Sequence, residues 1–309
     1  MGIYAHLTTW RGVPVVDWSS ATDESLMGDR FYRIGTDWDE EEPWLDQFAL
    51  FLTRPGVSRV TGLIVGFWGE EDGQLPHIVE AIAGAREKLT SLSALFIGDI
   101  IGDENEISWI RQTDLSPLLT AYPALEHLGV RGTQGLSLGI PKLTGLKSLT
   151  IESGGLPVSV IEEVSGAELP MLEHLELYLG TNGYGGDSSV DDLQTIFQHG
   201  PEKWPRLTYL GLRDCEYADG LAGAVAADGG VPVLRHVKTL DLSLGTLGDG
   251  GVRALAECPS VARLVKLDIH RHYASEASVA LLTGLGITVD ASDAQGEADE
   301  DDRYVAVSE

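Results

Sequence analysis

The sequence predicts an α/β solenoid, with parallel strands on a concave face and helices on a convex face. Three observations predict it. A short apolar pattern recurs eight times, stretches with helical periodicity separate most of the recurrences, and the recurrence distance suits one strand, one turn and one helix. A length of 309 residues allows one large domain or two ordinary ones. The repeats favour a single solenoid over residues 58–290.

The recurring pattern is an apolar residue, two variable positions, a leucine, one variable position and another apolar residue. Successive recurrences start between 21 residues (Leu125 to Leu146) and 35 residues (Leu172 to Leu207) apart. Side chains alternate along a strand, so the last two apolar residues of each pattern point into the core and their neighbours point out. The eight members are Val60-Leu63-Val65, Leu92-Leu95-Ile97, Leu125-Leu128-Val130, Leu146-Leu149-Ile151, Leu172-Leu175-Leu177, Leu207-Leu210-Leu212, Val237-Leu240-Leu242 and Leu264-Leu267-Ile269.

Apolar residues at spacings of three and four predict helices between the strands, at 76–88, 114–121, 158–164, 189–198, 221–227, 250–257 and 276–282. Ser189 and Asp192 form a capping-box-like start, and Gly200 is expected to end that helix. Strand followed by helix, repeated, predicts parallel strands with right-handed crossovers. The short unit at 125–142 has Gly, Thr and Pro where a helix would lie, so we expect an extended or tight-turn return there.

The segment from Val237 to Leu255 resembles a leucine-rich repeat of the ribonuclease-inhibitor-like kind, and residues 58–290 resemble uncharacterised bacterial leucine-rich-repeat proteins. The resemblance implies a horseshoe. That family usually has Asn or Cys three residues after the last apolar residue of the strand, where the side chain ties adjacent turns together. Only Cys215 conforms, so we expect no asparagine ladder. The other seven positions hold Trp68, Ile100, Thr133, Gly154, Gly180, Gly245 and His272.

The two ends of the chain depart from the repeat. Residues 1–57 contain seven Trp, Phe and Tyr between Trp10 and Phe48, too apolar for a disordered arm, so we interpret them as a cap with a helix at 44–52. The acidic run at 37–42 precedes that helix, and we interpret it as a solvated loop rather than a binding site. Residues 291–309 are acidic and predicted to be disordered, with a docked strand at 303–307 as the alternative.

Composition restricts the possible partners. The chain has 21 Lys and Arg against 48 Asp and Glu, a formal net charge of −27, which disfavours nucleic acid because phosphate binding depends on basic side chains. Two cysteines are too few for a disulfide scaffold and lack metal-type spacing. The first ten residues have no basic start or apolar run, and no stretch reaches the roughly 18 apolar residues of a membrane span. We therefore expect a soluble cytoplasmic protein.

Outward-facing strand positions supply the candidate binding residues. Aromatic and arginine side chains on a rigid sheet are enriched among interface hot spots, which favours Tyr178, Tyr209, Arg131 and Arg213. The alternative is that Arg131 with Glu152, and Arg213 with Asp241, only pair across neighbouring strands. The predicted partner-binding residues are Arg131, Glu152, His174, Glu176, Tyr178, Tyr184, Tyr209, Arg213, Asp241, Asp268 and His270.

The glycine-rich stretch from Gly180 to Asp187 leaves the end of a predicted strand, with Tyr184 at its tip, and is either a clamp or a long turn. It lacks the Lys-Ser/Thr of a phosphate-binding loop and the strand-turn-helix spacing of a dinucleotide-binding fingerprint. Its aspartates also lack the alternating ligand spacing of a calcium loop. His174, Glu176, Asp241 and Asp268 could form an acid/base or metal cluster on the concave face, but catalytic motifs are absent from the sequence. We therefore expect no catalytic residue, cofactor or metal.

The sequence thus predicts a module that binds a protein partner, one with a basic surface, through its concave strand face. Two alternatives stay open. One is an enzyme with its site at the Gly180–Asp187 loop, and the other is an acidic inhibitor or antitoxin-like protein that masks a basic surface. The oligomeric state stays open as well.

Overall fold

A computed structural model describes residues 3–19, 25–36, 43–69, 73–140, 142–296, 298–299 and 302–309. Its strands form one twelve-stranded sheet in which each strand neighbours the next in the sequence. All neighbouring pairs are parallel except β1 with β2. The strands are β1 (Thr9–Trp10), β2 (Val13–Asp17), β3 (Phe31–Ile34), β4 (Gly62–Gly66), β5 (Ala94–Asp99), β6 (His127–Arg131), β7 (Ser148–Glu152), β8 (His174–Gly180), β9 (Tyr209–Cys215), β10 (Thr239–Asp241), β11 (Lys266–Asp268) and β12 (Thr288–Asp290).

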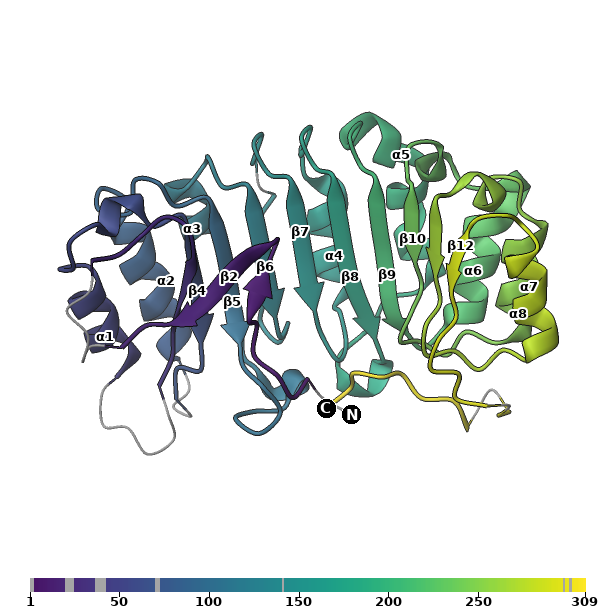
Figure 1. Cartoon of the computed structure of the whole chain (residues 1–309), viewed down its shortest axis with the longest axis horizontal. Helices are drawn as coiled ribbons and strands as arrows, with labels where there is room; N and C mark the ends of the chain where they lie inside the picture. The colour runs from purple at the N-terminus through teal and green to yellow at the C-terminus, as the bar shows by residue number, and fades with distance from the viewer. Residues whose placement is uncertain are drawn as a thin grey trace.

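The helices lie on one face of this sheet and leave the other face without helices (Figure 1). Parallel neighbours require a crossover, and the helices supply most of the crossovers. The predicted helices are present, with small differences at their ends. They are α1 (Trp44–Phe51), α2 (Gln74–Gly84), α3 (Ser116–Ala121), α4 (Val158–Gly166), α5 (Gln194–Lys203), α6 (Ala218–Ala226), α7 (Asp249–Glu257) and α8 (Glu276–Thr283).

The leucines of the repeat align across the sheet as predicted. The central leucines pair in one row from Leu63 in β4 to Leu267 in β11, and the sheet continues this row at Tyr32 and at Val289. Leu175, Leu177 and Leu240 are fully buried. Because each leucine packs on its neighbours in the row, the core runs along the stack. The described residues of the unit between β6 and β7 include no α-helix, also as predicted.

One predicted helix end differs from the structure. The capping box at Ser189 is present, but α5 continues through Gly200 and Pro201 to Lys203. A Cβ at Gly200 would lie 2.8 Å from a methyl carbon of Val233. This glycine therefore permits close packing within the core and does not end the helix.

The N-terminal residues fold back across the helix-free face. The two-residue turn Arg11-Gly12, with both residues in the left-handed region, joins β1 to β2, and β2 pairs with the edge strand β3. The hairpin then crosses over the strands as far as β6 (Figure 1). The expected cap at 1–57 thus also contributes strands to the sheet, whereas the acidic run at 37–42 lies outside the described residues.

The C-terminal residues also return to the sheet. Residues 303–309, here called the C-terminal strap, run along the carboxyl ends of the strands toward β8 (Figure 1). Val305, Ala306 and Val307 are buried, and the amide of Ala306 donates to the carbonyl of Leu244. The disorder predicted for 291–309 does not extend to these residues, because the short apolar run Val305-Ala306-Val307 gives them a surface to bury.

Candidate functional site

The helix-free face divides into two parts. On the first, here called the covered face, apolar side chains of β3 to β5 lie under the hairpin. Trp10 packs edge-on against Phe31 and Phe96, with ring centroids 5.9 and 5.4 Å apart, and Ile64 completes the cluster. A Cβ at Gly129 would lie 2.2 Å from the Phe96 ring, so this glycine makes room for the ring. The covered face is therefore occupied by the chain itself.

A buried carboxylate holds the N-terminal segment in place. Asp99 is fully buried, accepts a hydrogen bond from the amide of Leu7, and lies 2.8 Å from Arg33 Nη1 and 3.4 Å from Arg131 Nη1. Arg131 also donates to Glu152 Oε2 at 2.6 Å and is only 2% exposed. Arg131 therefore pairs across neighbouring strands and leaves almost no surface for a partner.

The outward residues of β7 to β12, together with Ser243 and His270 just beyond β10 and β11, are here called the open face. The hairpin reaches its border at Arg11, near Glu176 and Tyr209, and the C-terminal strap packs on the turns at the carboxyl ends of the strands. The centre of the open face is a polar network on β8 to β10. The guanidinium of Arg213 contacts Glu176, Tyr178 and Asp241, and it stacks over the Tyr178 ring at 4.9 Å. Burial alone would lower the pKa of Arg213, but the Tyr178 oxygen and the two carboxylates raise it above its ordinary value. The network thus remains charged and fixed in place.

Next to this network, His174 and Tyr209 stack with ring centroids 3.9 Å apart. The Tyr209 hydroxyl donates to Asp241 at 2.6 Å, and His174 Nε2 lies 3.0 Å from Glu176. Burial raises the pKa of Glu176, but the hydrogen bond from His174 and the charge of Arg213 hold it below its ordinary value. The hydroxyl of Tyr209, the carboxylates of Glu176 and Asp241 and one ring nitrogen of His174 therefore have partners within the protein, which orders the side chains before any partner arrives.

At the C-terminal end of the open face, Asp268, His270 and Asp290 bring possible metal-ligand atoms within 4.8 Å of one another. The ammonium of Lys266 lies 2.7 Å from Asp268 and 3.5 Å from Asp290, and His270 lies 2.8 Å from Asp268. The ammonium group of Lys266 therefore supplies the positive charge that the carboxylates of Asp268 and Asp290 face.

Most of the predicted partner-binding residues come together on the open face: Glu152, His174, Glu176, Tyr178, Tyr209, Arg213, Asp241, Asp268 and His270. The pairing of Arg213 with Asp241, weighed from the sequence as an alternative, is present at 3.4 Å. Tyr178 is nearly buried, whereas Tyr209 and His270 keep part of their surface in solvent. Tyr184 lies apart from these residues, at the edge of the sheet.

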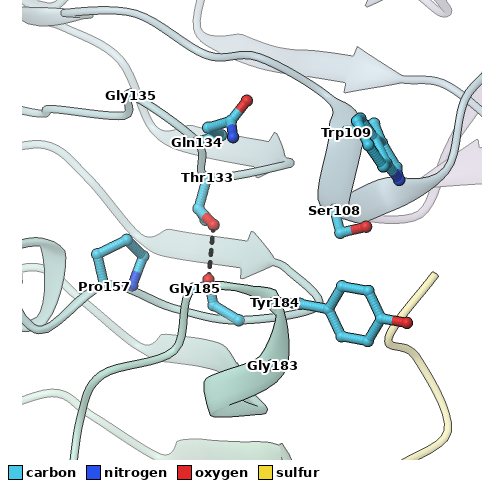
Figure 2. A pocket seen from close by; sticks show the side chains of 10 residues that line it. Ser108, Trp109, Thr133, Gln134, Gly135, Pro157, Gly183, Tyr184 and Gly185 are labelled. Atoms are coloured by element: carbon cyan, nitrogen blue, oxygen red, sulfur yellow. Dashed lines mark hydrogen bonds between the residues drawn. The ribbon is translucent and has the colours of Figure 1, made fainter.

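Tyr184 borders a cavity of about 500 Å³ at the carboxyl ends of the strands. The cavity spans the loops that follow β5, β6, β7 and β8, with Trp109 and Tyr184 as its aromatic walls (Figure 2). The lining residues are Ser108, Trp109, Thr133, Gln134, Gly135, Gly155, Pro157, Gly183, Tyr184 and Gly185. The sequence analysis did not identify Trp109 and Ser108 as site residues. The uneven lengths of the repeats could have indicated a recess at the carboxyl ends of the strands. The helix-free unit between β6 and β7 lies between longer ones.

The Gly180–Asp187 loop is an ordered turn. A Cβ at Gly180 would lie 2.1 Å from the carbonyl oxygen of Gly154, so the loops after β7 and β8 approach as closely as only glycine allows. Asp187 accepts a hydrogen bond from the amide of Val158 at 2.6 Å, at the start of α4. The carboxylate of Asp187 thus caps a helix.

Comparison with solved structures identifies a relative of this fold. A crystal structure of a protein from Bacteroides fragilis matches with a TM-score of 0.82 and 32% sequence identity, over 90% of this chain and 77% of that chain. The chain belongs to the same family as this Bacteroides protein. An internalin from Listeria monocytogenes matches with a TM-score of 0.36 and 14% identity, over 79% of this chain and 55% of that chain, too weakly to support an argument.

No family model and no curated protein matches the sequence of this chain. Among the helices within the described residues, none combines the length and the apolar composition that crossing a bilayer requires.

Proposed function

We propose that the chain is a leucine-rich-repeat solenoid that binds a protein partner on its open face. In this complex, basic side chains of the partner would face the acidic surface of the solenoid. The observation that supports the proposal is the difference between the two parts of the helix-free face. The chain's own hairpin fills the covered face with Trp10, whereas the open face presents an ordered polar surface that the hairpin reaches only at its tip, where Arg11 lies near Glu176 and Tyr209.

The open face suits recognition because its side chains are already held in position. Arg213, Glu176 and Asp241 are joined by short contacts, so these side chains would lose little conformational entropy when a partner docks on them. Tyr209, stacked on His174, adds a rigid aromatic surface of the kind found at hot spots. The net charge of −27 would accelerate association with a basic partner.

Substitution of Thr239 by arginine tests the proposal. Thr239 lies in β10 between Tyr209 and Lys266, and its side chain has no hydrogen bond within the described residues, so the change should obstruct the face without breaking a network. The wild-type chain should capture a stoichiometric partner from a lysate of its source cells at low salt. Thr239→Arg should lose that partner, and its melting temperature should stay within about 2 °C of the wild type.

The same substitution at Thr283, at the end of α8, is the matched control and should leave capture unchanged. Capture at full yield by Thr239→Arg would contradict the choice of face. Absence of any partner together with a hydrolase or transferase activity lost on deletion of residues 181–186 would favour the enzyme alternative.

A further inference from the structure

The cavity between Trp109 and Tyr184 has a simple structural origin. Its walls belong to two long loops, with Trp109 in a 3-10 turn (Ile107–Trp109) after β5 and Tyr184 in another (Asn182–Tyr184) after β8. Its floor comes from the loops after β6 and β7, where Thr133 donates a hydrogen bond to the carbonyl of Gly155 at 2.9 Å (Figure 2). Its volume falls within the roughly 300–1,000 Å³ usual for ligand clefts.

Two exposed aromatic side chains border this cavity. Trp109 is 65% exposed and Tyr184 is 38% exposed, although most large apolar side chains of the chain are buried. Figure 2 shows both rings on the same side of the cavity, with Ser108 between them in this view. Exposed aromatic rings that border one cavity are expected where a ligand covers them.

Two observations indicate the charge of that ligand. The hydroxyl of Tyr184 donates to Glu309 Oε1 at 2.6 Å, so the C-terminal strap brings a carboxylate to the rim. The charges of Glu309 and Glu106 both raise the pKa of Tyr184, after the hydrogen bond itself as the largest cause. Among the described residues that line the cavity, none has a charged side chain. A cation beside the aromatic faces would thus meet carboxylates without meeting a like charge in the lining.

Polar groups of the lining also lack partners. The hydroxyl oxygen of Ser108 is shielded from solvent and has no hydrogen-bond partner within the described residues. The side-chain amide of Gln134 forms no hydrogen bond there either, and its residue is exposed. A guanidinium group has five N–H donors in a plane and stacks well on aromatic faces, so it suits acceptors next to rings better than an ammonium does.

We propose that this cavity receives an arginine side chain of a basic polypeptide partner, stacked against Trp109 and Tyr184 and paired with Glu309. The proposal rests on the proposed function, because it identifies one contact of the same partner. It places this contact at the carboxyl edge of the strands, away from the polar network of the open face.

Titration of the full chain with fluorescein-labelled peptides tests this inference by fluorescence anisotropy. One peptide of about twelve residues alternates Gly, Ser and Arg, and a second replaces every Arg by the neutral isostere citrulline. The arginine peptide should bind at least tenfold more tightly than the citrulline peptide. Trp109→Ala and Tyr184→Ala should each weaken its binding about tenfold, and Tyr184→Phe, which keeps the ring and loses the bond to Glu309, about threefold.

Leu281→Ala, an exposed apolar residue of α8, is the control and should bind the arginine peptide like the wild type. Equal binding of the two peptides would overturn the inference, as would tight binding that persists in Trp109→Ala or an absence of detectable binding. Binding of cellohexaose that Trp109→Ala abolishes, without binding of the arginine peptide, would assign the cavity to a neutral sugar and overturn it too.

The two proposals can fail separately. If Thr239→Arg loses the captured partner and Trp109→Ala retains it, the open face stands and the cavity inference falls. If the arginine peptide binds through Trp109 and Thr239→Arg captures a partner normally, the cavity inference stands and the open face is not the contact surface.

Discussion

Both ends of this chain return to the sheet and dock beside a buried aspartate, but the groups that surround the two aspartates differ. At the N-terminal segment, Asp99 faces the guanidinium groups of Arg33 and Arg131. At the C-terminal strap, Asp214 accepts the amide of Val307 at 2.8 Å, and its other oxygen has no partner among the described residues. Burial raises the pKa of Asp214 to about 8. The first carboxylate therefore docks its segment as part of an ion-pair network. Burial favours the protonated form of the second, whereas the hydrogen bonds from the strap amides favour its ionised form.

The comparison indicates how firmly each segment is held. The N-terminal segment adds the aromatic cluster around Trp10 to its ion pairs and covers part of a face. The strap buries three small or medium apolar residues and exposes 69% of Tyr304. Because burial of apolar area and compensated charge both stabilise docking, we expect the N-terminal segment to belong to the cooperative core and the strap to open locally.

The largest expected effect comes from Asp99→Ala. The substitution leaves the nearly buried guanidinium of Arg131 with one carboxylate fewer and removes the acceptor of the Leu7 amide. Loss of one partner of a buried pair costs about 3–5 kcal/mol, so urea denaturation should show a fall of that size. The matched change Asp268→Ala, whose partner Lys266 is more than a third exposed, should cost less than about 1 kcal/mol. Equal losses for the two variants would contradict the role given to Asp99.

Trp10→Ala should have the next largest effect. It removes a side chain that is 7% exposed and contacts Phe31, Phe96 and His127, so we expect a loss of about 3 kcal/mol in the free energy of unfolding. Tyr304→Ala on the strap removes an aromatic ring that is mostly in solvent and should change stability by less than about 0.5 kcal/mol. Thermal melts of both variants check the contrast. A small effect of Trp10→Ala would mean that the hairpin does not stabilise the fold.

Much of the fold could be predicted from the sequence because the repeat is visible in it. Leu63 to Leu267 occupy one paired row, as the alternation of side chains along a strand requires. The path of the two ends could not be predicted in this way. Trp10 and Phe96 are far apart in the sequence, and no local pattern indicates that a hairpin places one on the other.

The candidate site was predictable only where it follows the strands. The register places Glu176 and Asp241 on either side of Gly211, two residues before Arg213 on the same face, so their network follows from the repeat. Arg131 faces outward by the same rule, yet it is buried because the N-terminal segment and Asp99 lie beside it. The cavity between Trp109 and Tyr184 depends on loops, whose conformations no periodicity encodes.

The smallest expected effect concerns the strap and its dependence on pH. Because the pKa of Asp214 is raised when the chain is folded, the folded state keeps a proton that the unfolded state loses above about pH 4. Opening the strap lets water reach Asp214, and we expect the lost burial, which raises this pKa, to outweigh the lost hydrogen bonds from Val307 and Ala306, which lower it. Docking of the strap should therefore weaken as the pH rises from about 4 to about 8 and change little above that. The change is limited by the free energy of opening the strap locally, so we expect about 1 kcal/mol.

Hydrogen exchange of the Val307 and Ala306 amides, expressed as protection factors, measures this change directly. The wild type should lose roughly fivefold in protection between pH 5 and pH 8, which corresponds to about 1 kcal/mol. Asp214→Asn removes the ionisation and keeps an acceptor for Val307, so its protection should be flat over the same range. Amides of the Leu175 and Leu177 core serve as the internal control and should not follow this pH dependence. A parallel decline in wild type and Asp214→Asn would show that another group causes it, and the contrast between the two buried aspartates would then be wrong.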